Sequence, residues 1–157
     1  MEKMRLNIKI NCARSEKLAK KIFIDTNPLI YLVGKQEPYY EKVVSYIAKG
    51  ILEKAEFYTS TITDAEFLLK PYLTKGFEKI ELFKSCLKQM NFLKCFINEE
   101  IAENAAKLRA KYTGLKLADA LQLSASIACE CDEFFTNDKR LRQVVEARVV
   151  YLSDWEK

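Results

Sequence analysis

Four acidic residues, Asp25, Glu66, Asp119 and Asp138, stand where the sequence could build a reactive site. Asp25 closes the apolar segment KIFID, and Asp138 follows a second apolar segment, EFFT. In an open α/β sheet the binding site forms where the carboxyl ends of the strands meet the following loops, so we expect these two acids at one edge. Glu66 and Asp119 lie in early turns of predicted helices that could line the same crevice.

Carboxylates gathered in this way point to one kind of chemistry. Four of them in a poorly hydrated crevice repel one another strongly unless divalent cations neutralise their charge. Ligation by oxygen atoms alone is typical of Mg²⁺ or Mn²⁺, ions that activate a water, orient a phosphodiester and stabilise the leaving oxygen. The sequence contains no histidine, which excludes Ser-His-Asp and Cys-His catalysis and leaves metal-assisted chemistry open.

Each acid also has a purely structural interpretation. Asp25 and Asp138 suit helix N-caps or turns, Glu66 suits a solvated helix position, and Asp119 suits the first turn of a helix. Asp119 is nevertheless surrounded by apolar residues in the chain, where a charge usually has a reason to be. Asp64 points to another side of its helix from Glu66, and we expect it to be a solvated acid. The joint placement of the four acids favours a site.

Alternating strand and helix patterns predict the elements that position these acids. We expect strands at 21–25, 56–60, 92–97, 133–136 and 148–152. We expect helices at 28–34, 39–54, 61–70, 99–112 and 117–130, and a short one at 139–145. Pro71 should interrupt or kink the third of these, and further helix should follow it to about residue 90. This alternation implies a mostly parallel sheet with helices on both faces.

The bulk composition is that of one folded unit. With 157 residues, 49% of them hydrophobic, we expect a single domain over 21–157. It follows an extension over 1–20 in which RLNIKINC alternates like a strand and whose role stays open. No apolar run approaches membrane-spanning length and no signal segment is evident, so we expect a soluble, cytoplasmic protein. The net charge of +4 permits a nucleic-acid partner without proving one.

The five cysteines form an odd set without a Cys-x-x-Cys pair, and we expect reduced thiols. A structural zinc held by Cys129 and Cys131 with Cys86 and Cys95 is the alternative. It is disfavoured because the one-residue gap departs from the usual two to four residues, and because cysteine is a common buried apolar residue.

As an ordered set, the segments FIDTNPLIY, TSTITDAEF, LKLADALQLSASI and FFTNDKRL resemble the four motif regions of the PIN domain, especially of VapC-like toxin ribonucleases. The resemblance extends from about Lys21 to Leu152. It implies a three-layer α/β/α sandwich with a mostly parallel central sheet, an acidic pocket that binds Mg²⁺ or Mn²⁺, and endonucleolytic cleavage of RNA.

The resemblance also assigns roles to individual residues. The family's four acidic positions fall on Asp25, Glu66, Asp119 and Asp138. Hydroxyl and amide groups can orient ligating carboxylates, and this supporting role would fall on neighbours within the first and last motifs. These neighbours are Thr26, Asn27, Thr136 and Asn137.

The partners that the resemblance implies are a second copy of the chain and a cognate antitoxin, since VapC-like proteins commonly dimerise and are held inactive by one. A type II toxin is therefore the leading hypothesis. A PIN-like nuclease of RNA processing and a non-catalytic binding module with the same fold stay open, although loss of acids would favour the latter and all four are present. A phosphatase of the haloacid dehalogenase type would need an aspartate where Asn27 stands.

Overall fold

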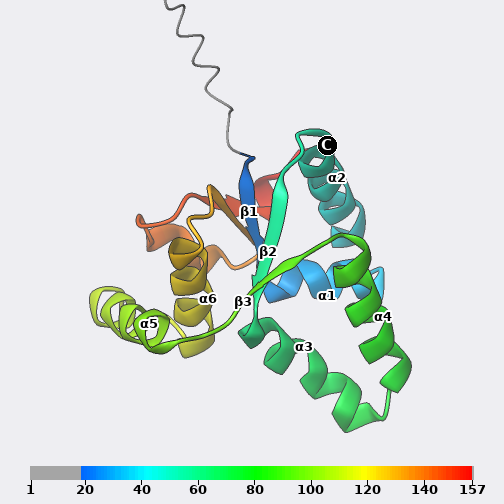
Figure 1. Cartoon of the computed structure of the whole chain (residues 1–157), viewed down its shortest axis with the longest axis horizontal. Coiled ribbons are helices and arrows are strands. Elements are labelled where there is room, and N and C mark those ends of the chain that lie inside the picture. The colour runs from blue at the N-terminus through cyan, green and yellow to red at the C-terminus, as the bar shows by residue number, and fades with distance from the viewer. Residues whose placement is uncertain (1–18, 157) are drawn as a thin grey trace, which may run out of the picture.

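A five-stranded parallel sheet forms the centre of the computed structural model, which describes residues 19–156 (Figure 1). Its order across the sheet is β3-β2-β1-β4-β5, and every neighbouring pair is parallel. The predicted strands are confirmed, although the third and the last are shorter than expected. The first 18 residues, which hold most of the expected extension, lie outside the described part. The strands are β1 (Lys21–Ile24), β2 (Glu56–Ser60), β3 (Leu93–Cys95), β4 (Glu133–Thr136) and β5 (Val149–Tyr151).

The helices follow the strands in alternation, as predicted. They are α1 (Thr26–Gly34), α2 (Tyr39–Leu52), α3 (Thr61–Thr74), α4 (Phe77–Gln89), α5 (Glu99–Lys111) and α6 (Leu117–Ala128), with 3₁₀ turns η1 (Lys139–Gln143) and η2 (Leu152–Asp154). The segment expected as a short helix at 139–145 is therefore η1. Within residues 19–156, no helix combines the length and apolar character needed to cross a membrane.

Of the expectation that Pro71 interrupts or kinks the third helix, the interruption is wrong. α3 continues through Pro71 to Thr74 and ends where Lys75 takes a left-handed conformation. Proline removes one backbone donor from the helix, and here its ring is buried in the packed structure. The helix end is closed by the Gly76 N–H, which donates to the Pro71 carbonyl at 2.9 Å.

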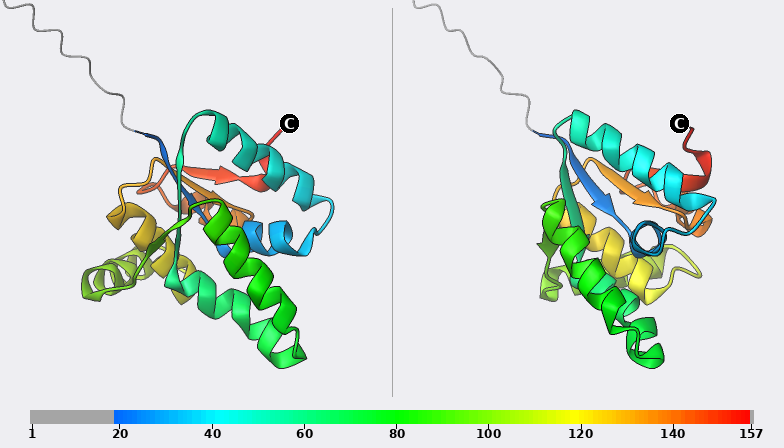
Figure 2. Two further views of the ribbon diagram at one scale, coloured as in Figure 1. Left: turned by 45° about the vertical axis from the view of Figure 1, so that its right-hand side comes forward. Right: turned by 90° about the vertical axis from the view of Figure 1, so that its right-hand side faces the viewer.

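Two hydrophobic cores lie on opposite faces of the sheet, and β1 contributes to both. Ile22 and Ile24 pack into the core beneath α1 to α4, whereas Phe23 packs into the core beneath α5 and α6. All three side chains are buried, which explains the unbroken apolar run of this strand. Figures 1 and 2 show α5 and α6 on one side of the sheet and α1, α2 and α4 on the other. The predicted α/β sandwich with helices on both faces is confirmed.

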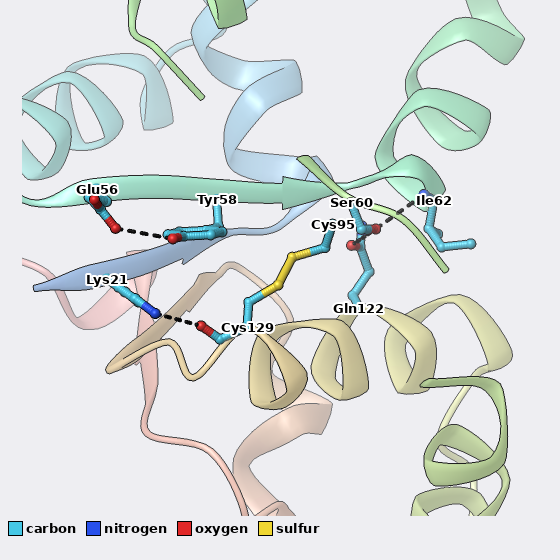
Figure 3. Close-up of a disulfide and its surroundings, with 8 residues drawn as sticks. All are labelled: Lys21, Glu56, Tyr58, Ser60, Ile62, Cys95, Gln122 and Cys129. Carbon is cyan, nitrogen blue, oxygen red and sulfur yellow. Dashed lines mark hydrogen bonds between the residues drawn. A yellow bond between two sulfur atoms is a disulfide. The ribbon is translucent and has the colours of Figure 1, made fainter. Parts of the chain in front are cut away.

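The expectation of reduced thiols is wrong for one pair of cysteines. Cys95 at the end of β3 and Cys129 just after α6 form a disulfide (Figure 3). Both residues belong to the core between the sheet and α6, so packing of the helix brings them together. Cys86 and Cys131 remain free thiols. Because two of its four ligands are bonded to each other, the alternative of a structural zinc is excluded.

Candidate acidic site at the sheet edge

Asp25 and Asp138 follow the neighbouring central strands β1 and β4, so both lie at the carboxyl edge of the sheet, as predicted. Each also acts as an N-cap. Asp25 Oδ1 accepts from the Thr26 N–H at 2.8 Å, and Asp138 Oδ1 accepts from the Arg140 N–H at 2.9 Å. The expectation that these two acids suit helix N-caps or turns is therefore correct. The capping hydrogen bonds hold their carboxylates at the carboxyl edge of the sheet.

Asp25 is the most buried of the four acids, with 6% of its surface exposed. Its pKa is raised from 3.8 to about 7, mainly by burial and to a smaller extent by the charges of Asp119 and Glu66. Two hydrogen bonds oppose this shift: the one from the Thr26 N–H and one at 2.7 Å from Thr136 Oγ1 to Asp25 Oδ2. The two hydrogen bonds hold this carboxylate in place. Its buried environment favours the ionised form only when a positive charge is near.

Asp119 and Asp138 share the guanidinium group of Arg140. Arg140 Nη2 lies 3.6 Å from Asp119 Oδ2, and the same guanidinium forms a bidentate pair with Asp138. Burial raises the pKa of Asp119, and the neighbouring charge of Asp138 raises it further. The hydrogen bond from Arg140 lowers the pKa of Asp138. A positive charge thus already bridges two of the predicted site acids.

Glu66 reaches the same region from α3. Its Oε2 accepts from Thr26 Oγ1 at 2.5 Å, and its charge raises the pKa of both Asp25 and Asp119. Asp64 points elsewhere: it pairs with Lys94 of β3 at 2.5 Å. The expectation that Asp64 is a solvated acid is confirmed in part, because its side chain is 31% exposed but paired with Lys94, and its position away from Glu66 is as predicted.

The supporting residues divide into two kinds. Thr26 and Thr136 are buried and contact the acids directly; Thr136 Oγ1 also accepts from the Asp138 N–H at 3.0 Å. Asn137 instead donates to the Tyr31 hydroxyl at 3.2 Å. Asn27 is exposed on α1, and its side chain makes no hydrogen bond within residues 19–156. Of the four predicted supporting residues, the two threonines are therefore the ones that contact carboxylates of the site.

Two residues beside the acids were not predicted. Arg140 is the cation that bridges Asp119 and Asp138, and its only signal in the sequence is its place two residues after Asp138. Gln122 is 1% exposed and forms hydrogen bonds with three hydroxyl groups, among them Thr26. A lone amide in the apolar helix LADALQLSASI is a visible anomaly, because buried amides need partners.

The donor set fits a hard divalent cation. All four acids supply carboxylate oxygens, the ligands that Mg²⁺ and Mn²⁺ prefer. In the described part of the chain, no three carboxylate, thiol or imidazole side chains are drawn close enough to hold an ion as they stand. The guanidinium of Arg140 lies between two of the four carboxylates, those of Asp119 and Asp138. Burial raises the pKa of Asp25 and Asp119 most, and the charges of neighbouring acids add to the shift. A cation of higher charge at this position would stabilise both carboxylates as anions.

A parallel α/β sandwich with acids at the carboxyl edge of its sheet defines the class of this protein. The profile of the PIN domain family matches residues 22–147, most of the chain. The chain belongs to the PIN domain family. A comparison with curated protein sequences finds no match.

Solved structures with the same fold include a toxin–antitoxin complex. This complex, from Klebsiella pneumoniae, shows 25% identity over 83% of this chain and 97% of that one, at a TM-score of 0.63. Another solved structure is VapBC2 from Rickettsia felis bound to a DNA fragment of its promoter, with 17% identity, 83% and 98% coverage, and a TM-score of 0.65. FitAcB from Neisseria gonorrhoeae shows 21% identity, 85% and 99% coverage, and a TM-score of 0.61. These likenesses cover nearly the full length of the matched chains.

Proposed function

We propose that this protein is a Mg²⁺- or Mn²⁺-dependent endoribonuclease and the toxin of a type II toxin–antitoxin pair. The observation that carries the proposal is the meeting of acids from four separate segments at one sheet edge. Burial and then the charges of neighbouring acids raise the pKa of Asp25 and Asp119, and Asp119 and Asp138 share the Arg140 guanidinium. Membership of the PIN domain family and the likeness to a toxin–antitoxin complex support the same function.

In this proposal Asp25, Asp119 and Asp138 hold the cation together with Glu66. When bound, the cation supplies positive charge for hydrolysis of a phosphodiester. Thr136 and the Thr26 N–H fix both oxygens of Asp25, so this carboxylate does not need to reorganise.

Binding of the RNA backbone needs positive charge beside the acids. The side chain of Arg140 is half-exposed at the rim of the site. Guanidinium groups bind phosphate oxygens well, so Arg140 is the residue we expect to contact the RNA backbone once a cation replaces it between the acids.

The partners we propose are RNA as substrate, a cognate antitoxin, and a second copy of the chain. The antitoxin is supported by the toxin–antitoxin complex from Klebsiella pneumoniae, which contains a chain of this fold. The homodimer rests on the family resemblance of the four motif regions.

The test is cleavage of purified cellular RNA followed by sequencing of the new ends. Wild-type protein should produce defined ends with Mg²⁺ or Mn²⁺ and none with a chelator. Glu66→Gln should lower the rate by on the order of 100-fold. Asp64→Asn is the matched control, because it removes a carboxylate of the same helix that pairs with Lys94, outside the site. Equal cleavage by wild type and Glu66→Gln, or cleavage that survives the chelator, would refute the proposal.

A further inference from the structure

Gln122 lies beside the acidic site in contacts that a space-filling core residue does not need. Its Nε2 donates to Thr26 Oγ1 at 2.9 Å and to Thr63 Oγ1 at 2.8 Å, and its Oε1 accepts from Ser60 Oγ at 2.6 Å. These partners come from α1, α3 and the end of β2, so one side chain of α6 joins three other elements. An apolar residue would fill the same space without burying an amide, which costs stability unless every group is paired.

The direction of these hydrogen bonds is fixed from the far end of the network. Ser60 Oγ caps α3 by accepting from the Ile62 N–H at 3.1 Å, so its hydroxyl hydrogen is directed to Gln122 Oε1. Figure 3 shows Ser60 and Gln122 facing each other beside the disulfide that ties α6 to β3. With its oxygen held by Ser60, the amide can present only N–H groups to Thr26.

This orientation decides what the Thr26 hydroxyl does. Its oxygen accepts from Gln122, so its single hydrogen is available to a further acceptor. Two acceptors are near: Glu66 Oε2 at 2.5 Å and Thr63 Oγ1 at 3.2 Å. The carboxylate is closer and charged, and hydrogen bonds to charged acceptors are the stronger ones.

We infer that Gln122 is a positioning residue of the acidic site, which acts through Thr26 to aim the Glu66 carboxylate at the cation. This inference rests on the proposed function. It adds to that function a relay, a chain of hydrogen bonds that runs from Ser60 through Gln122 and Thr26 to Glu66. The residue touches neither cation nor RNA, and its effect is passed on by hydrogen bonds.

The test compares Mn²⁺ affinity, measured by paramagnetic resonance titration, in wild type and Gln122→Met. Methionine has nearly the same length and volume but offers no N–H donor. The affinity should fall about tenfold, the range seen when outer partners of metal ligands are removed. Ser124→Ala is the matched control: Ser124 is buried on the same helix, its hydroxyl has no partner among the described residues, and the affinity should not change.

A double-mutant cycle with Thr26→Val separates the relay from a general effect on packing. If Gln122 acts through Thr26, Gln122→Met should not weaken Mn²⁺ binding further in the Thr26→Val background. An unchanged affinity in Gln122→Met, or the same loss in both backgrounds, would overturn the inference.

Folding of each variant is checked by circular dichroism. Should Gln122→Met not fold, Gln122→Glu tests the same point with an isosteric side chain, because its carboxylate would draw the Thr26 hydrogen away from Glu66. Undiminished Mn²⁺ affinity in Gln122→Glu would equally refute the relay. A wild-type protein that neither binds Mn²⁺ nor cleaves RNA would instead refute the proposed function. In that case Ser124→Ala would show neither Mn²⁺ binding nor RNA cleavage as well.

Discussion

Asp25→Asn should stabilise the cation-free protein while abolishing RNA cleavage. Asparagine keeps the side-chain oxygen that caps α1 through the Thr26 N–H. Its amide NH2 takes the place of the oxygen that accepts from Thr136, so that bond must reverse, with the amide donating to Thr136 Oγ1. What it removes is a carboxyl group that burial and neighbouring acids make difficult to ionise. The substitution therefore separates the capping role of this position from its charge.

The size of the effect follows from the pKa of Asp25. In the folded protein this pKa is about 7, against an ordinary value of 3.8. Because the folded state holds the proton more tightly, the stability that this group contributes is present below pH 3.8 and is lost as the pH rises through 7. At about 1.4 kcal/mol per pH unit, the loss above pH 7 is on the order of 4 kcal/mol. A side chain that does not titrate escapes this loss.

The assay is urea unfolding of wild type and Asp25→Asn at pH 5 and pH 8 with a chelator present. Between pH 5 and pH 8, the difference in unfolding free energy between the two proteins should grow in favour of Asp25→Asn. The contributions of the other acids cancel in this difference because both proteins contain them. Replacing the chelator by Mg²⁺ or Mn²⁺ at pH 8 should stabilise the wild type and leave the variant nearly unchanged. A pH dependence that is identical in the two proteins would show that the Asp25 carboxyl is not held in the environment described.

Three further perturbations test other parts of the structure. Asp119→Asn should weaken Mn²⁺ binding at least about tenfold in a calorimetric titration, since it removes a ligand oxygen; equal affinity would exclude it from the cation site. Arg140→Gln removes the guanidinium that competes with the cation, and because such a half-exposed pair is worth about 1 kcal/mol or less, Mn²⁺ should bind up to roughly fivefold more tightly. Weaker binding would contradict this competition. Replacing Cys95 and Cys129 together by serine should lower the unfolding free energy by about 3–4 kcal/mol for a closed loop of 34 residues, whereas Cys86→Ser should change it little.

The main elements of the fold and the location of the acids could be predicted because they depend on local patterns. The apolar run at 22–24 marks a strand buried on both faces, and the polar residues after it mark its end. Since parallel strands end at one edge, the positions of Asp25 and Asp138 follow without any knowledge of side-chain contacts. The path of α3 through Pro71 could not be predicted, because burial of the ring is a property of the packed core.

The parts that could not be predicted depend on which segments meet. The disulfide joins residues 34 apart, and nothing in the cysteine spacing selects Cys95 and Cys129 from the other cysteines. Arg140 is near Asp138 in sequence, but its contact with Asp119 exists only because α6 packs beside the loop after β4. Such pairings follow from the completed fold.

The structural and the chemical interpretations of an acid at a strand end are not alternatives in this fold. The Thr26 N–H holds one oxygen of Asp25 as the N-cap of α1, and Thr136 holds the other from the end of β4. Because both bonds come from elements that are fixed by the two cores, the capping interaction that begins the helix also aims the carboxylate at Asp119 and Glu66. An acid in this position costs stability unless a cation is near, so its presence where asparagine would cap equally well points to a demand for charge.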